Sequence, residues 1–552
     1  MAQTLLVVVD TETGRIPTKQ NEDGTSGRLE LRVGDNEDVR TGAGRLDGNL
    51  GEAFAWHLDA FTKEADDYEI PGFAESAQFR AAEEAEAAEA GAEEEGEEEA
   101  FGVLEGSRYD IQGGAAGLSW VGERGHLGLA VSLIDGTYGL VGGHEEEGEE
   151  EEEAEEEGVG IIELEQTRVD FSGELLSPFS IVEALSFRIG INDYEHSEIE
   201  GNGELGTFFE NDAWEARFSA EHGSVSGFTG VIGLQFGDRE FSAVGEEAFV
   251  APAELDTIAM FWAGEREFDG FSLELGARVD NTSIDGSIDG EDIFRGFSTQ
   301  SASIGFVIPQ SEIMSWTLLF DYAERAPTIE ELFSFGPHLA TGRFEVGDSG
   351  LEEEAAFNIS LSWAYETDNF DAHINLYRYD FNDYIYTIAT GEEEDGLPEF
   401  EYVQNSAEFL GLDIELGVHL LDIAGGDLDL QASFDTVAAE IDSGDEDIDA
   451  PQIPSDRFST SLVWDSNAWY ATLTYSDVSS QNDVAPFELG TDGYTDVSAK
   501  VERSFKFGDS ELKAFIQGRN LTDEEQREHV SFVKDLAPSP GRSLEVGVQY
   551  SF

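Results

Sequence analysis

Apolar and polar residues alternate along many short segments of this chain, and residues 543–552 show the pattern most clearly. The apolar positions of this segment are Leu544, Val546, Val548, Tyr550 and Phe552. Successive side chains of a β-strand point to opposite faces, so this strand has one apolar and one polar face. Because it ends on an aromatic residue, we expect it to close a transmembrane barrel, with the apolar face against lipid and the polar face towards the lumen.

The same alternation recurs along the chain. It is found in residues 28–33, 53–61, 127–133, 357–363, 412–420, 458–464, 469–475, 495–505 and 512–517. A membrane strand of an outer-membrane barrel needs about 10 residues. At this spacing the chain predicts about 22 strands.

The connections between these strands alternate in length. The short ones are residues 48–51, 122–125, 367–369, 465–467 and 508–509, and the long ones are residues 71–105, 138–160, 241–254, 323–354, 391–400, 438–455 and 520–541. Up-and-down barrels of the outer membrane have short periplasmic turns and long outer loops. The predicted fold is therefore an all-β, antiparallel, transmembrane up-and-down barrel with long acidic extracellular loops.

Composition narrows the classes of function. The 552 residues contain no cysteine and no run of about 18 apolar residues, which excludes thiolate chemistry and a membrane-spanning helix. The formal net charge of -91 excludes nucleic-acid binding through a basic face. The charge fits either a saline habitat or a surface that gathers cations. Phosphate-binding glycine loops, G-x-S-x-G and H-E-x-x-H are absent, so we expect no enzyme.

Two of the long connections are acidic and of low complexity. Residues 81–99 are mostly Ala and Glu and can form a solvated helix, and the run from His144 to Glu157 is expected to be unstructured. One interpretation is a solvated loop without a specific ligand. The other is a weak cation-binding loop, in which carboxylates take hard ions such as Ca²⁺ and His144 adds a softer ligand.

Several segments of the C-terminal half resemble TonB-dependent receptors, the gated nutrient importers of the Gram-negative outer membrane. Residues 324–333 (ERAPTIEELF) resemble an outer-loop signature of that family, and residues 350–354 (GLEEE) precede a strand. Residues 518–523 (GRNLTD) resemble the end of the penultimate strand, and residues 540–542 (PGR) precede the last one. The resemblance implies an outer-membrane location, contact with lipid, a monomer and no required cofactor.

A narrower resemblance is to the zinc-uptake (ZnuD-like) branch. It rests on residues 192–196 (NDYEH), 241–250 (FSAVGEEAFV) and 336–347 (GPHLATGRFEVG), and on acidic loops that carry histidine. It implies uptake of a divalent metal ion, with zinc as the transported ligand. The alternative is an acidic outer-membrane or secreted β protein that binds cations without transport.

The front of the chain departs from that family. Residues 7–17 resemble only the exit of the family's N-terminal plug into the first strand, and no secretory signal precedes them. We therefore interpret residues 1–20 as the remnant of the plug-to-barrel connection and residues 21–552 as the barrel. On this interpretation the chain is a fragment or plug-less form with an open lumen. The TonB-ExbB-ExbD system would be a partner only if the full protein has a plug and a Ton box.

The two strongest candidate metal ligands lie on the predicted outer loops. Glu247 and His338 supply the carboxylate and the imidazole that Zn²⁺ accepts, and both fall within the zinc-branch resemblance. Weaker candidates are the group Asp193, Tyr194 and His196, together with His529 and His144. The remaining histidines lie in strands or beside short turns, and we assign structural roles to His57, His126, His222, His373 and His419.

Overall fold

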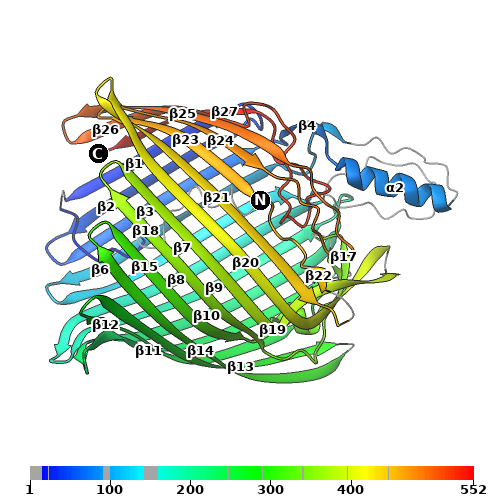
Figure 1. Ribbon diagram of the computed structural model, residues 1–552, viewed down its shortest axis with the longest axis horizontal. Helices are drawn as coiled ribbons and strands as arrows, with labels where there is room; N and C mark the ends of the chain where they lie inside the picture. The colour runs from blue at the N-terminus through cyan, green and yellow to red at the C-terminus, as the bar shows by residue number, and fades with distance from the viewer. Residues whose placement is uncertain are drawn as a thin grey trace.

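The computed structural model describes residues 15–22, 24–90, 100–141, 160–245, 248–288, 290–338, 341–394, 396–444 and 447–552. Within these residues the chain forms one 25-stranded sheet and a separate two-stranded pair. Three strands of the large sheet, β16, β17 and β22, are short and belong to loops. The other 22 form the wall of a closed antiparallel barrel (Figure 1), which confirms the predicted fold class and number of strands.

The strands of the wall follow one another around the barrel. The first half consists of β1 (Thr25–Gly34), β2 (Arg40–Leu50), β3 (Phe54–Ala65), β6 (Tyr109–Gly122), β7 (Gly125–Gly139), β8 (Ile161–Phe179), β9 (Val182–Ile199), β10 (Leu205–Val225), β11 (Phe228–Gly245), β12 (Ala253–Phe268) and β13 (Phe271–Ile288). The second half consists of β14 (Glu291–Ser311), β15 (Met314–Arg325), β18 (Glu354–Thr367), β19 (Phe370–Glu394), β20 (Leu397–Ile423), β21 (Gly426–Asp442), β23 (Arg457–Ser466), β24 (Trp469–Val478), β25 (Tyr494–Phe507), β26 (Ser510–Arg519) and β27 (Ser543–Ser551).

The first and last strands close the barrel. β1 pairs with β2 on one side and with β27 on the other, with Leu31 opposite Val548 and Val33 opposite Val546. The apolar residues of β27 are exposed on the outside of the barrel, as the alternation predicted. Closure leaves the described wall without an unpaired edge, which a strand in lipid could not tolerate.

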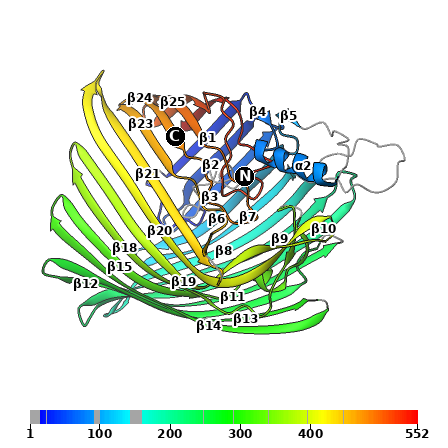
Figure 2. The same cartoon turned by 45° about the vertical axis from the view of Figure 1, so that its right-hand side comes forward.

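The long connections gather at one end of the barrel and tight turns at the other. Between β3 and β6, the outer connection contains β4 (Glu69–Phe73), α2 (Ala77–Ala90) and β5 (Phe101–Val103). Figures 1 and 2 show α2 projecting from the loop end, away from the wall. The solvated helix predicted within the Ala/Glu-rich segment is therefore present through Ala90. Among the described residues, no helix has the length and hydrophobicity needed to cross a bilayer.

One predicted connection is wrong, and another connection was not predicted. Residues 391–400 are not a long loop, because β19 runs to Glu394 and β20 begins at Leu397. These strands extend beyond the apolar belt, where both faces are polar, and so lose the alternation that marks a strand. Residues 479–493 form an outer connection between β24 and β25 that the sequence pattern did not indicate.

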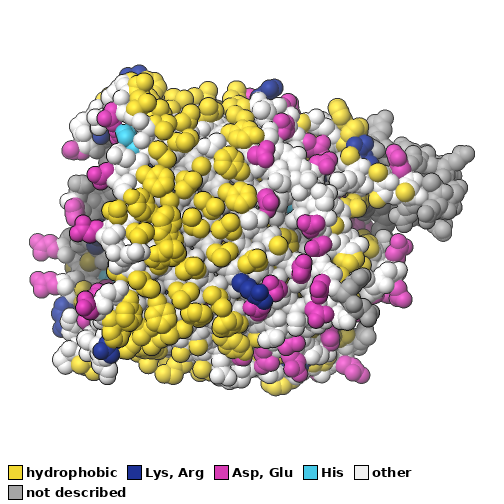
Figure 3. Space-filling model, in the orientation of Figure 1, with side chains coloured by type: hydrophobic (Ala, Val, Ile, Leu, Met, Phe, Trp, Pro, Cys, Tyr) yellow, Lys and Arg dark blue, Asp and Glu magenta, His cyan; other side chains and the backbone are white. Residues whose placement is uncertain are grey.

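An apolar belt surrounds the barrel between its two ends. Figure 3 shows hydrophobic side chains covering the face of the wall, while acidic side chains gather mainly towards the loop end. Leu118, Leu129, Leu234, Met260 and Leu416 are among the exposed apolar residues of this belt. Large exposed apolar surface of this kind is stable only against lipid, so the belt gives the position of the membrane.

The largest apolar core lies inside the outer mouth of the barrel. The connection between β15 and β18 contains α3 (Ile329–Phe333), β16 (Phe335–His338) and β17 (Arg343–Val346). Ile329, Leu332 and Phe333 of α3 are buried against Ile284 and Phe297 of the inner wall. This outer loop is therefore folded into the mouth and does not extend freely into solvent.

The first described residues lie against the inner wall of the barrel. A Cβ atom at Gly117 of β6 would meet the carbonyl oxygen of Arg15 at 1.7 Å, and one at Gly128 of β7 would meet Ile16 at 2.3 Å. Glycine is therefore required where the chain approaches the wall this closely. Residues 1–14 lie outside the described residues. The division into a connection at residues 1–20 and a barrel at residues 21–552 stays a prediction.

Candidate metal site at the outer mouth

His338 is held at the outer mouth by a small hairpin. β16 and β17 pair antiparallel, with His338 opposite Arg343, and β17 pairs in parallel with the outer end of β20. The hairpin follows α3 directly and is therefore anchored to the apolar core. His338 is thus placed by packed secondary structure, on the outer side of the barrel that the sequence predicted.

A buried carboxylate orients the His338 ring. Glu345 Oε1 lies 2.9 Å from His338 Nδ1 and accepts from Thr341 Oγ1 at 3.1 Å, while Tyr402 donates to Oε2 at 3.0 Å. Burial by itself raises the pKa of the Glu345 carboxyl, but the hydrogen bonds and charge of His338, with those from Tyr402 and Thr341, hold its pKa below its usual value. Glu345 is therefore an ionised acceptor at neutral pH.

This contact also determines which ring nitrogen is free. An ionised carboxylate only accepts hydrogen bonds, so Nδ1 of His338 carries the proton that it donates to Glu345. When the ring carries no other proton, its lone pair is on Nε2, for which no hydrogen bond is found within the described residues. A histidine that donates one N–H to a carboxylate and offers the other nitrogen is the usual arrangement of a metal-ligating imidazole.

Stacked aromatic rings connect His338 with a second histidine. His338 stacks on Phe249 with ring centroids 4.1 Å apart, and His196 stacks on Phe209 at 4.3 Å. The two phenylalanines are themselves in contact, with centroids 6.5 Å apart. Both phenylalanines belong to the apolar core of the mouth. The imidazoles of His338 and His196 thus pack on the same apolar core, but the rings of Phe249 and Phe209 separate them.

Two predicted ligands cannot be placed. Glu247 and His144 lie outside the described residues, so the pairing of Glu247 with His338 stays a prediction. Phe249, two residues after Glu247 in the sequence, is the residue that stacks on His338.

The second predicted group is divided between the two faces of β9. Tyr194 and His196 lie on one face, with ring centroids 5.5 Å apart, whereas Asp193 is on the other face because side chains alternate along a strand. Nε2 of His196 is 3.9 Å from Glu198 Oε1, and Nδ1 is buried without a hydrogen bond in the described part of the chain. Asp193 therefore does not join this group.

His529 is in the interior of the loop end. Its Nδ1 lies 3.0 Å from Thr491 Oγ1 and its Nε2 lies 3.3 Å from Glu488 Oε1, and only 3% of the residue is exposed. Burial raises the pKa of the Glu488 carboxyl, but His529, the Gln452 N–H and Lys534 hold it below its usual value. This arrangement joins the β24–β25 connection to the β26–β27 connection and leaves neither ring nitrogen open to solvent.

Ion pairs and a helix cap within and next to residues 324–333 join the two ends of the connection that carries His338. We call this group of contacts the latch. Arg325 contacts Glu331 at 2.9 Å and Glu354 at 3.0 Å, while Thr328 caps α3 through a capping box with Glu331. The latch fastens the beginning and end of the connection that carries His338. These residues therefore act on the site through the position of α3 and the hairpin.

Two histidines to which the sequence analysis gave structural roles have different surroundings in the structure. His57 is structural as predicted, because it is buried with Asp47 and Asp59 at 2.8 and 2.6 Å from its two nitrogens. His419 instead lies beside three aspartates at the short-turn end of the barrel. The signal in the sequence is His419, Asp422, Asp427 and Asp429 on both sides of a tight turn, and only the strand register shows that they meet.

The barrel matches known proteins in sequence and in structure. Residues 165–521 match the family model described as TonB dependent receptor-like, beta-barrel. Among solved structures, the copper transporter OprC has a TM-score of 0.76 at 16% identity over 97% of this chain and 81% of that chain. The FrpB iron transporter from Neisseria meningitidis (F3-3 variant) has a TM-score of 0.72 at 14% identity over 100% and 83%.

A third similar structure is the Serratia marcescens hemophore receptor HasR, solved as a double mutant in complex with its hemophore HasA and heme. It has a TM-score of 0.70 at 16% identity and covers 97% of this chain and 82% of that chain. At these identities the solved structures establish the fold, whereas the family model matches well over half of the sequence. The chain therefore belongs to the TonB-dependent receptor-like β-barrel family of the Gram-negative outer membrane, whose members are transporters and not enzymes.

Proposed function

We propose that this barrel takes up a divalent metal ion across the outer membrane, that the ion is zinc, and that His338 is one of its ligands at the outer mouth. The observation that carries this proposal is the hydrogen bond between His338 Nδ1 and Glu345, which leaves the Nε2 lone pair for a metal. Glu247 is proposed as a second ligand. An open site with few protein ligands suits a transporter, which must release its ion.

The ligand chemistry favours zinc over softer ions. Copper(I) prefers thiolate and thioether ligands, but the chain has no cysteine and only three methionines. Met260 is exposed in the apolar belt, and Met314 begins β15 beside a short turn. Neither described methionine is at the outer mouth, and Met1 lies outside the described residues. The imidazole of His338 and the proposed carboxylate of Glu247 are ligand types that zinc accepts.

The similar structures support the wider class of substrate. Their titles name a copper transporter, an iron transporter and a receptor for a heme-bearing hemophore. This fold therefore carries metal ions and metal-bearing ligands in other proteins, and we propose the same class here. The acidic loop end would raise the local concentration of cations and speed their encounter with the mouth, most strongly at low ionic strength.

Zinc titration of the purified barrel tests the proposal. The titration compares the wild type with His338→Ala at moderate salt, with calcium in excess to occupy the carboxylates that bind ions weakly. We expect one zinc site to weaken by at least about 10–100-fold in the variant, because loss of an outer-shell partner alone has that effect and this variant removes the ligand. His126→Ala, which removes a histidine at the opposite end of the barrel, is the matched control and should bind as the wild type does.

The result against the proposal is equally clear. If the wild type and His338→Ala bind zinc alike, the loop carboxylates bind the ion and the named site is wrong. If calcium displaces zinc from the site on equal terms, the imidazole does not select the metal, since hard ions favour oxygen ligands.

A further inference from the structure

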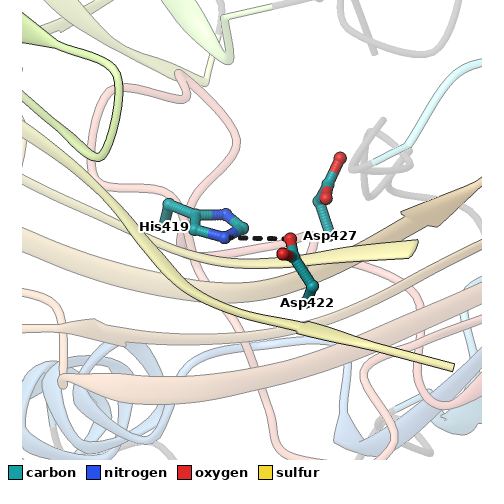
Figure 4. A group of neighbouring side chains, drawn as sticks. All are labelled: His419, Asp422 and Asp427. Atoms are coloured by element: carbon teal, nitrogen blue, oxygen red, sulfur yellow. Dashed lines mark ion pairs between the residues drawn. The ribbon is translucent and has the colours of Figure 1, made fainter. Parts of the chain in front are cut away.

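A compact group of ligand atoms lies at the other end of the barrel, where β20 turns into β21. His419 is opposite Asp429 and Asp422 is opposite Asp427 in the strand register. One ligand atom from each of His419, Asp422 and Asp427 lies within 4.8 Å of the other two. Figure 4 shows the His419 ring directed at the Asp422 carboxylate, with the Asp427 side chain beside them.

A β-bulge brings these side chains together. Residues 419 and 422 are three apart and would face opposite sides of a regular strand. The register of β20 shifts between His419 and Leu421, which returns Asp422 to the side of His419. Asp427 and Asp429 are two apart on β21 and share a face. The meeting of His419 with Asp422 therefore depends on this bulge in β20.

The His419 ring is oriented for ligation. Its Nδ1 lies 2.9 Å from Asp429 Oδ1, and its Nε2 lies 3.3 Å from Asp422 Oδ1. The contact with Asp429 fixes the ring with Nε2 directed at Asp422, so a metal ion bound between these two atoms would take the place of the proton that now pairs them. His57 also has a carboxylate at each ring nitrogen, but it is buried, so that ions have no access to its ring. Asp422 is 83% exposed, so ions have access to the Nε2 side of His419.

The negative charge of the group is not balanced by protein. Three carboxylates surround one imidazole, and none of the four side chains forms an ion pair with Lys or Arg among the described residues. Carboxylates at this separation repel one another, and a divalent cation between them would remove the repulsion. Among the described residues a second cluster of this kind, Asp238, Glu254 and Asp256, has no imidazole and carries no selectivity for a transition metal.

We propose that His419, Asp422 and Asp427 bind a divalent transition-metal ion of the zinc class at the periplasmic rim of the barrel, with Asp429 as the residue that positions the imidazole. Three protein ligands leave further coordination positions for water, as in exchangeable zinc sites. The site lies at the end opposite to His338 and does not depend on the function proposed for the mouth. It would hold an ion between the two strands of the β20–β21 hairpin.

Metal titration of the full chain with Zn²⁺ and with Co²⁺ tests this site, the latter followed by its visible absorption. The background variant is His338→Ala, which separates this site from the outer mouth, and calcium is present in excess. Adding His419→Ala should weaken one Zn²⁺ site on the order of 10–100-fold and remove its Co²⁺ absorption bands. Asp422→Asn, a nearly isosteric change at an exposed position, should weaken the same site.

The matched control is His373→Ala, which removes a histidine of the neighbouring strand β19 whose Nε2 is 3.7 Å from Glu366. It should leave the Zn²⁺ site and the Co²⁺ spectrum unchanged. Equal Zn²⁺ binding with and without His419 would overturn the proposal. Displacement of Zn²⁺ by Ca²⁺ at similar concentrations would also overturn it. In that case the ion would be bound by exposed carboxylates without selection by the imidazole. Loss of the site in His338→Ala alone would instead assign the binding to the mouth.

Discussion

The Nδ1 atom of His338 lies 2.9 Å from Oε1 of Glu345, across a hairpin that the chain folds into the mouth of the barrel. Glu345 is buried while the His338 ring is partly exposed, so the carboxylate is held by the protein and the imidazole is open on its other side. This pair therefore connects the packing of the outer loop with its proposed chemistry.

Glu345→Gln should weaken zinc binding without removing the ligand. The amide carries no charge and no longer requires a proton on His338 Nδ1, so the ring loses its fixed tautomer. We expect zinc affinity to fall on the order of 10-fold, less than in His338→Ala. Glu401→Gln, which neutralises an exposed carboxylate of β20 nearby, is the control for charge alone. Equal effects of the two glutamine variants in the titration would contradict an orienting role.

The folded outer loops should become less stable at acid pH. Glu345 and Glu488 both have a folded-state pKa below the ordinary value of 4.5. A depressed pKa contributes stability that is fully present above the ordinary value and is lost as the pH falls through the folded value. The protection of β16 and β17 against hydrogen exchange, corrected for the intrinsic exchange rate at each pH, should therefore be high at neutral pH and fall below pH 4.5. Glu345→Gln should reduce this pH dependence, and an unchanged profile in that variant would argue against it.

Arg325→Ala should open the latch of the mouth. Removing the guanidinium leaves Glu331 and Glu354 without their common partner, and Glu354 is buried. A buried acceptor left without a partner costs on the order of 1–3 kcal/mol of local stability, and a charged acceptor costs more. Faster hydrogen exchange in α3, with an unchanged barrel wall, is the expected measurement. Arg168→Ala breaks an exposed pair with Asp170 and should cost less than about 1 kcal/mol.

Val546→Arg should destabilise the closing strand. Val546 is exposed on the outer face of β27, in the middle of the strand. Arginine facing lipid costs about 2–4 kcal/mol near the midplane of the bilayer. The measurement is the free energy of unfolding in lipid vesicles. Gln549→Arg, on the opposite face beside Glu30, is the control and should be tolerated; a similar loss in both variants would mean that the assignment of faces is wrong.

The sequence indicated most of the barrel because a membrane strand has a simple periodic requirement. Lipid on one side and a polar lumen on the other force alternation, and this pattern is readable at Leu544, Val546 and Val548 without any tertiary contact. Where the strands leave the membrane, as at residues 391–400, both faces are polar and the pattern no longer distinguishes strand from loop.

The histidines show what alternation alone decides. The separation of Asp193 from His196 follows from their odd spacing on one strand, and could have been stated from the sequence once β9 was known to be regular there. The partner of His338, by contrast, is seven residues away on the other strand of a loop hairpin, and no local pattern marks Glu345 as buried.

By itself the sequence determined the fold class, the number of strands, the lipid-facing residues and the outward position of His338, because each follows from the period of two along a strand and from loop length. Only the tertiary structure decided which side chains meet. The Glu345–His338 pair depends on the β15–β18 connection folding into the mouth, and the His419 group depends on a bulge that shifts Asp422 to another face. Both result from packing and register between strands, which a single strand's pattern does not contain.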